Sequence, residues 1–194
     1  MTGKPLLAIS PHAAELDREM LFIAKSLLDK RELSPASFGF RSLWKEFLDT
    51  FTKYQIKMID DNGLVASCKY GCSFCCSHWV EDVYSFESEI IATELTNAID
   101  KAELVLIRDS LYSDEAELLR VSAIVDSTLS TTAFDSDESI DHEDLLLSSF
   151  YQLSLPCPLL DKAGMCRVYN LRPLTCRAYC NFGHAEICRP ENIN

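Results

Sequence analysis

Two stretches near the N-terminus repeat apolar residues at the period of an α-helix. Ser10, followed by proline, is typical of a helix start, with serine as the N-cap and proline at the first helical position. Apolar residues then recur near a 3.6-residue period until about Glu32, and again from about Ser42 to Asn62. We therefore expect residues 1–63 to form an antiparallel helical pair.

The helical period returns in the middle of the chain and is interrupted by one polar stretch. Helical patterns start at Ser85, which we expect to act as an N-cap, and run from Leu104 to about Val125 and from about Glu143 to Leu153. Residues 127–144 are rich in Ser, Thr and Asp and contain six acidic residues but no Lys or Arg, a composition typical of a solvated loop. Closely spaced Pro, Gly and Cys near the C-terminus predict irregular structure.

These elements predict a mainly α fold, in which a small helical domain and an irregular cysteine-rich C-terminal segment are tied together by metal. A chain of 194 residues with 47% apolar composition is long enough for one domain with its own core. We expect a single domain, residues 1–194, in which the helical pair of residues 1–63 precedes a cysteine-cluster region, residues 64–188, containing an acidic loop at residues 127–144.

Composition also bears on location and partners. The apolar run at the N-terminus is too short for a signal peptide, and no stretch approaches the length of about 18 apolar residues that a membrane span needs. We therefore expect a cytoplasmic protein with no membrane partner, and in that compartment clustered cysteines more often hold metal than form disulfides.

The net charge of −12 is unevenly distributed. Residues 81–144 hold 18 acidic and 3 basic residues, a local charge of −15, whereas residues 157–189 hold 2 acidic and 5 basic residues, a local charge of +3. Neutralisation of phosphates dominates nonspecific binding to nucleic acids, so an acidic chain with one small basic patch argues against a nucleic-acid partner.

The nine cysteines fall into two groups. Residues 68–76 read C-K-Y-G-C-S-F-C-C, the other five cysteines lie between residues 157 and 188, and the 80 residues between the groups contain none. Four thiolates are the ligand set of many zinc sites and of iron–sulfur clusters. Closing such a site between the two groups would make metal binding a constraint on folding.

Several alternatives stay open for these cysteines. A helical-period row of thiols can be part of a hydrophobic core, although ordinary core cysteines do not concentrate in this way. The number of thiols allows one metal site or two, His78 and His184 are alternative ligands, and Cys188 is the weakest candidate.

Four arginines interleave the C-terminal cysteines, and their guanidinium groups can offset the charge of a multi-thiolate site: Arg167, Arg172, Arg177 and Arg189. We expect this role for Arg172 and Arg177 more than for the other two. The spacing C-x3-C-x2-C of Cys68, Cys72 and Cys75 also matches a radical-SAM motif, but a helical chain of this length cannot supply a (β/α) barrel, so we reject that interpretation.

Three segments together carry a resemblance to a known family. They are residues 68–76, the C-P-L-L-D sequence that starts at Cys157, and the G-M-C-R-V-Y-N-L-R-P-L-T-C-R sequence of residues 164–177. They resemble the YkgJ-type cysteine-cluster family, which is named for a CxxCxxCC signature and described as a zinc- or iron-chelating domain. The resemblance covers about residues 64–188. It departs from the signature at one point, because three residues and not two separate Cys68 from Cys72.

The resemblance implies a set of metal ligands and of supporting residues. The ligands lie among Cys68, Cys72, Cys75, Cys76, Cys157, Cys166, Cys176 and Cys180, and the supports are Tyr169, Arg172, Pro173 and Arg177. An all-cysteine set favours an iron–sulfur cluster, of the 4Fe-4S type, over zinc, because many structural zinc sites include histidine.

Three functions follow as hypotheses. The leading one is a cytosolic protein that chelates an iron–sulfur cluster or zinc and has a structural, redox or metal-handling role. The second is a metal-dependent enzyme similar to the flagellin lysine N-methylases, which share the cysteine pattern, are associated with an iron–sulfur cluster and are considerably longer; the sequence indicates no catalytic residue. The third is a zinc-stabilised interaction module whose acidic region, residues 81–144, binds a basic protein partner.

Overall fold

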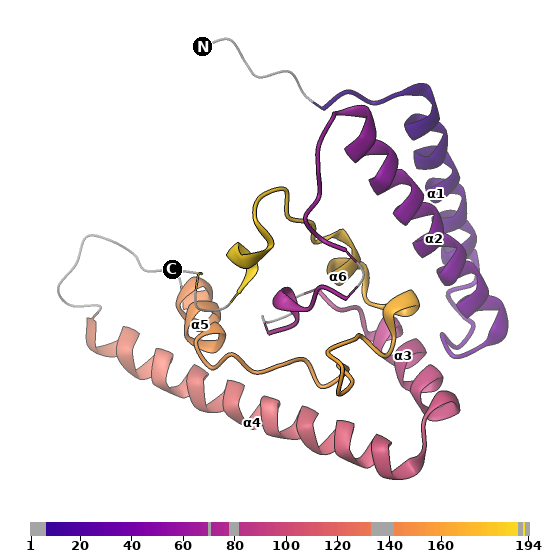
Figure 1. The fold of residues 1–194 in the computed structure, drawn as a ribbon. Coiled ribbons are helices and arrows are strands. Elements are labelled where there is room, and N and C mark those ends of the chain that lie inside the picture. Colours follow the sequence, from indigo (N-terminus) through magenta and orange to yellow (C-terminus); the bar gives the residue numbers. More distant parts are fainter. Residues whose placement is uncertain (1–6, 70, 78–81, 133–141, 190–191, 193–194) are drawn as a thin grey trace, which may run out of the picture. The chain divides into compact units, whose positions relative to one another are not determined.

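The computed structural model describes residues 7–69, 71–77, 82–132, 142–189 and 192 (Figure 1). Helices make up 68% of these residues, which include six α-helices and no β-strand. The predicted mainly α fold is therefore confirmed, whereas the metal tie stays a prediction. Within the same ranges, no helix has the length and apolar character that crossing a membrane requires.

The chain forms two compact units, each built from segments that are distant in the sequence. Unit 1 contains Met1–Lys69, Glu81–Asn97 and Val168–Gly183, and unit 2 contains Tyr70–Val80, Ala98–Arg167 and His184–Asn194. The cysteine motif at residues 68–76 thus begins in unit 1 and continues in unit 2. The expectation of a single domain stays a prediction.

Unit 1 starts with the predicted helical pair, α1 (Pro11–Asp29) and α2 (Phe38–Asp61), which lie side by side (Figure 1). Ser10 is the N-cap of α1 as predicted, because its hydroxyl accepts the N–H of Ala13 at 3.2 Å. The predicted start of α2 near Ser42 is wrong by four residues. Its N-cap is Ser37, whose hydroxyl accepts a backbone N–H of the first turn, and the helix runs through Gly39.

The core of unit 1 joins α2 to α3 (Ser85–Ala98). Trp44 and Ile90 are buried there, and the ring of Phe86 meets that of Trp44 edge-on at a centroid separation of 4.8 Å. Leu171 and Leu174, which belong to the short helices η2 (Tyr169–Leu171) and α6 (Leu174–Ala178), pack against the same cluster. The core therefore fixes the C-terminal segment that carries two of the cysteines.

Ser85 is not the N-cap of α3, in contrast to the prediction. It is the first helical residue, and the Tyr84 carbonyl before it already accepts the N–H of Glu87 at 2.9 Å. The Glu87 carboxylate reaches back to accept the N–H of Tyr84 at 3.1 Å, as in a capping box. The capping hydrogen bond that we predicted for Ser85 is therefore made by Glu87, in the first turn of the helix.

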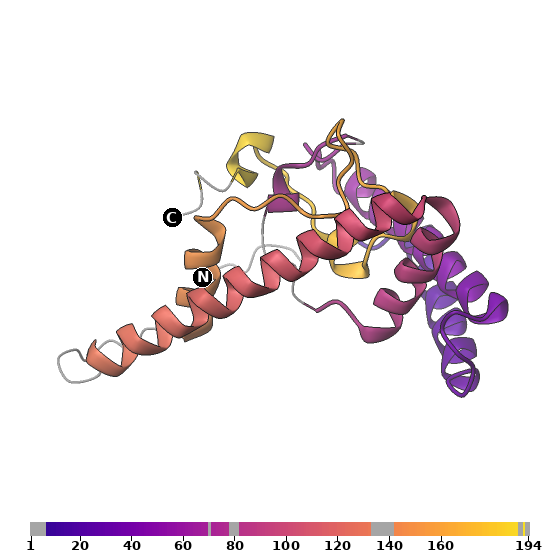
Figure 2. The same ribbon diagram turned by 90° about the horizontal axis from the view of Figure 1, so that it is seen from below.

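Unit 2 contains the long helix α4 (Lys101–Thr132) and α5 (His142–Tyr151), which lies beside the C-terminal half of α4 (Figures 1 and 2). His142 Nε2 lies 2.8 Å from a carboxylate oxygen of Asp126. The expected loop at residues 127–144 is wrong for residues 127–132 and 142–144, which are helical, and residues 133–141 lie outside the described part.

The extra turns of α4 have a local and a tertiary cause. The hydroxyls of Thr128 and Ser130 donate to carbonyls four residues earlier, at 2.9 and 2.7 Å, so these polar side chains are hydrogen-bonded within the helix. Val125 is only 2% exposed, which anchors this part of the helix by burial.

The remaining part of unit 2 is irregular, as predicted. It contains two short helices, η1 (Phe74–Ser77) and η3 (Ala185–Cys188), which pack against each other. In the segment between α5 and Val168, a carboxylate oxygen of Asp161 accepts the N–H groups of Ala163 and Met165 at 2.8 and 2.9 Å. This turn passes through Gly164, whose φ of +75° suits glycine.

Candidate metal centre

Four thiols gather in unit 2, and we call Cys75, Cys76, Cys157 and Cys166 the four-thiol group. Cys75 and Cys76 lie on η1, and the N–H of Cys157 donates to the Cys76 carbonyl at 2.7 Å. An isolated antiparallel bridge pairs Leu160 with Cys166 and brings the chain back after the Asp161 turn. Two separate stretches of backbone, η1 and the segment of residues 157–166, therefore supply the group.

The protonation of these thiols reflects their proximity. The pKa of Cys76 is raised, first by its hydrogen bond to Cys75, then by burial, and then by the negative charges that Cys75, Cys157 and Cys166 would carry as thiolates. Burial is the main cause of the raised pKa of Cys157, followed by the negative charges of Cys166, Asp114 and Cys75. Without a cation the thiols of Cys76 and Cys157 are held protonated, and a metal would have to displace their protons.

Two arginines of unit 2, Arg189 and Arg167, contact other elements of the same unit. The guanidinium of Arg189 stacks on the ring of Phe74, at 4.6 Å from its centroid. Phe74 belongs to η1 and directly precedes Cys75 in the sequence. Arg167 instead pairs with Glu103 of α4 at 2.7 Å. Cys188 is buried on η3, which packs against η1.

A second contact between thiols lies in unit 1, and we call Cys68 and Cys180 the thiol pair. Burial, and next the charge and the hydrogen bonding of the neighbouring Cys68, raise the pKa of Cys180. The backbone N–H of Asn181 donates to Cys68 Sγ at 3.2 Å. The Asn181 carbonyl in turn accepts the N–H and the hydroxyl of Ser67 at 2.8 and 3.0 Å, so the two chain segments are joined next to both cysteines.

Two further predicted ligands, Cys72 and Cys176, belong to different units. Cys72 follows Gly71 in unit 2 and is half-buried, and Cys176 lies in the middle of α6 in unit 1. Their role as ligands stays a prediction. Of the histidines considered as alternatives, His184 directly precedes η3, and His78 lies outside the described residues.

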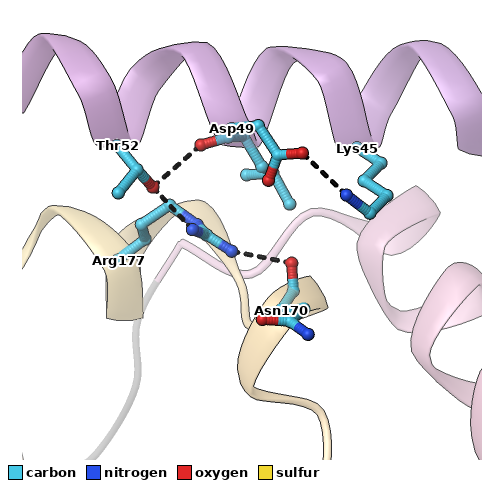
Figure 3. A network of polar contacts seen from close by, with 6 residues as sticks. Lys45, Asp49, Thr52, Asn170 and Arg177 are labelled. Atoms are coloured by element: carbon cyan, nitrogen blue, oxygen red, sulfur yellow. Dashed lines mark hydrogen bonds and ion pairs between the residues drawn. The ribbon is translucent and has the colours of Figure 1, made fainter. Parts of the chain in front are cut away.

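The signature arginines of unit 1 make contacts near α6, which contains Cys176. Arg177 is only 6% exposed, and it donates to the Thr52 hydroxyl of α2 at 2.7 Å and to the Asn170 carbonyl at 2.8 Å (Figure 3). Burial, and next the charge of Arg172, lower its pKa. Arg172 itself stacks on the Tyr169 ring at 4.3 Å. The bond from Arg177 to Thr52 joins α6 to α2, and charge compensation by these arginines stays a prediction.

The donor chemistry of the four-thiol group fits a soft or borderline metal. Thiolates suit zinc and iron–sulfur clusters, whereas magnesium and calcium require oxygen ligands. Among the described residues, no three Cys, His, Asp or Glu side chains converge closely enough to hold an ion as they stand. The four thiols are thus chemically suitable ligands, and their side chains would have to move closer together to bind one metal ion.

Two supporting residues were not singled out from the sequence. Glu87, 1% exposed, accepts the N–H of Leu174 at 2.7 Å and so links α3 to the start of α6. Its position three and four residues before the apolar Ile90 and Ile91 places it on the buried face of α3, which is a signal that periodicity could have provided. Asn181 acts through its backbone, which no sequence pattern marks.

Helical architecture and grouped thiols define a cysteine-rich metal-binding class of protein. The chain belongs to the CxxCxxCC family, described as "Putative zinc- or iron-chelating domain", whose model matches residues 67–192. That membership assigns metal binding to the chain at the level of zinc or iron. No curated protein and no solved structure matches the chain.

Proposed function

We propose that the chain binds one metal centre, zinc or an iron–sulfur cluster, through Cys75, Cys76, Cys157 and Cys166. The observation that carries the proposal is the backbone geometry of unit 2, in which the N–H of Cys157 donates to the Cys76 carbonyl at 2.7 Å and the bridge between Leu160 and Cys166 brings Cys166 back toward that segment. When bound, zinc supplies a fixed tetrahedral tie, and a cluster supplies a one-electron redox centre.

The role that the surroundings support best is structural. The segment between α5 and Val168 is irregular and carries no buried apolar side chain among residues 152–167, so burial alone holds it weakly. A metal bridging it to η1 would add binding free energy to folding, since the site forms only in the folded chain. Deprotonation of thiols with raised pKa values also means that binding releases protons and strengthens as the pH rises.

The test is metal analysis of protein purified without oxygen, together with an absorption spectrum. Cys76→Ser and Cys157→Ser should each lose most of the bound metal and lower the melting temperature, whereas the matched control Cys188→Ser should keep the metal. Iron with equimolar acid-labile sulfide and a brown colour identifies a cluster, and colourless protein with zinc identifies a structural zinc site. Full metal content in both Cys76→Ser and Cys157→Ser contradicts the assignment.

A further inference from the structure

We propose that one exposed face of α4 pairs with the same face of a second copy of this chain, as an antiparallel, two-fold symmetric helix pair. The large side chains of this face are Val105, Tyr112 and Leu119, which are 42%, 63% and 64% exposed. Exposed apolar side chains that line up along one element mark interaction surfaces, whereas isolated ones need no explanation. The proposal concerns association of the chain and goes beyond the proposed metal centre.

The three large side chains lie on the side of α4 opposite its buried side. They follow one another at intervals of seven residues, so they share one face of the helix. Ile107, Val121 and Val125 of the same helix are buried. At about 100° per residue, these buried side chains lie roughly half a turn around the helix from the exposed ones. α4 therefore has two apolar sides, and one of them faces solvent.

Small or polar residues separate the large ones at the spacing of a coiled-coil seam. Ala102, Asp109 and Ala116 each stand three residues before one of the large residues, and all three are exposed. We call these six residues the α4 stripe. Two copies of the stripe interlock when a large residue of one copy meets a small residue of the other, because large against large clashes and small against small leaves a void.

This alternation selects an antiparallel pair. In a parallel pair each position of the stripe faces its own copy, so alanine meets alanine and Asp109 meets Asp109 of the second copy, where like charges repel. One antiparallel register matches the positions in both directions, and its pairs between the copies are Ala102 with Leu119, Val105 with Ala116, and Asp109 with Tyr112. In this register the Tyr112 hydroxyl is able to donate to the Asp109 carboxylate.

The charges beside the stripe fit the same register. Arg108 and Glu115 lie on one edge of the stripe, and in this register Arg108 of each copy faces Glu115 of the other, which gives two pairs of opposite charge. A shift by one heptad would instead bring Glu115 against Glu115. Within the chain Arg108 pairs with the adjacent Asp109 at 2.8 Å, but these side chains are 58% and 57% exposed, so the pair stabilises weakly and leaves Arg108 able to change partner.

The size of the contact sets the kind of association. The register overlaps residues 101–120 of both copies, about 30 Å of helix, and covers three large side chains from each copy. A contact of this size is small compared with the interfaces of permanent dimers, so dimerisation should be reversible and should depend on concentration.

The experiment measures the mass of the full chain by sedimentation equilibrium over a range of concentrations, with its metal and under reducing, oxygen-free conditions. We expect a reversible equilibrium between one copy and two. Leu119→Glu should weaken dimerisation by at least about tenfold, because a charge replaces an apolar side chain in the contact. The matched control Phe22→Glu makes the same kind of change at a 71% exposed side chain of α1 and should leave dimerisation unchanged.

Reversal of the two charges tests the antiparallel register. Arg108→Glu and Glu115→Arg should each weaken dimerisation, because each brings like charges together at both pairs, whereas the double variant should restore it. A chain that stays monomeric at every concentration would overturn the proposal. So would undiminished dimerisation of Leu119→Glu, or a double variant that dimerises no better than the single ones.

Two further measurements on the same samples keep the result separate from the fold and from the proposed metal centre. Circular dichroism of Leu119→Glu should show the helix content of the unmodified chain, because Leu119 is exposed. Metal content should be equal in all of these variants, since they lie outside the four-thiol group. Failure of the metal centre would appear as retained metal in Cys76→Ser and Cys157→Ser, and failure of the helix pair as the wrong mass.

Discussion

Replacing Arg177 by alanine tests the tie between α6 and α2. The substitution removes two hydrogen bonds from a charged donor, to Thr52 and Asn170, each contributing about 1.5–3 kcal/mol. Burial of the guanidinium, which lowers its pKa, offsets part of this gain. We therefore expect the free energy of unfolding to fall by about 2–4 kcal/mol. At about 2–4 °C per kcal/mol for a chain of this size, the melting temperature should fall by roughly 4–16 °C.

Urea unfolding followed by circular dichroism measures this loss, and two further variants locate its cause. Arg177→Lys keeps the charge, but its ammonium group cannot reproduce the planar geometry with which the guanidinium donates to Thr52 and Asn170. This variant should therefore be more stable than Arg177→Ala and less stable than the unmodified chain. Thr52→Val removes one acceptor, and the double variant should show a coupling of about 0.5–3 kcal/mol. Strictly additive losses, or a loss below about 0.5 kcal/mol for Arg177→Ala, would refute the reasoning, because surface substitutions alone produce changes of that size.

Two other substitutions test the core and the buried carboxylate of unit 1. Leu48 is fully buried, so Leu48→Ala should lower the free energy of unfolding by about 2–5 kcal/mol, whereas Val65→Ala, at a side chain 81% exposed, should change it by less than about 0.5 kcal/mol; equal effects in urea titrations would contradict the assigned core. Burial raises the pKa of Glu87, so the stability contributed by its protonated form is complete below the unfolded-state pKa and is lost as pH rises through the folded-state pKa. The stability of Glu87→Gln relative to the unmodified chain should therefore increase with pH between about 4 and 8, and a constant difference would count against the raised pKa.

The helices of unit 1 could be predicted because local signals and burial agree there. In α1 a serine cap, a first-turn proline and an amphipathic repeat all indicate the same start. The end of α4 could not be predicted, because Ser- and Thr-rich composition favours a loop, whereas the actual helix is held by burial of Val125 and by the return of α5. Tertiary contacts of this kind override local propensity.

The presence of a thiol site was predictable, but the pairing of the thiols was not. Cysteine density and motif order indicated metal chemistry, which family membership supports. Which cysteines meet depends on backbone hydrogen bonds between distant segments, such as Cys157 to Cys76 and Ser67 to Asn181. These bonds join positions 81 and 114 apart and leave no periodic trace in the sequence.

The division of one nine-residue motif between two sets of partners has a chemical consequence. Cys76 is surrounded by other thiols that favour its protonated form, and protonated thiols react slowly with oxidants, so this end of the motif is protected until a metal cation displaces the protons. Cys68, at the other end, is exposed, and its sulfur accepts the backbone N–H of Asn181 at 3.2 Å. Cys68 is therefore more open to solvent than Cys76, although both belong to the same nine-residue motif.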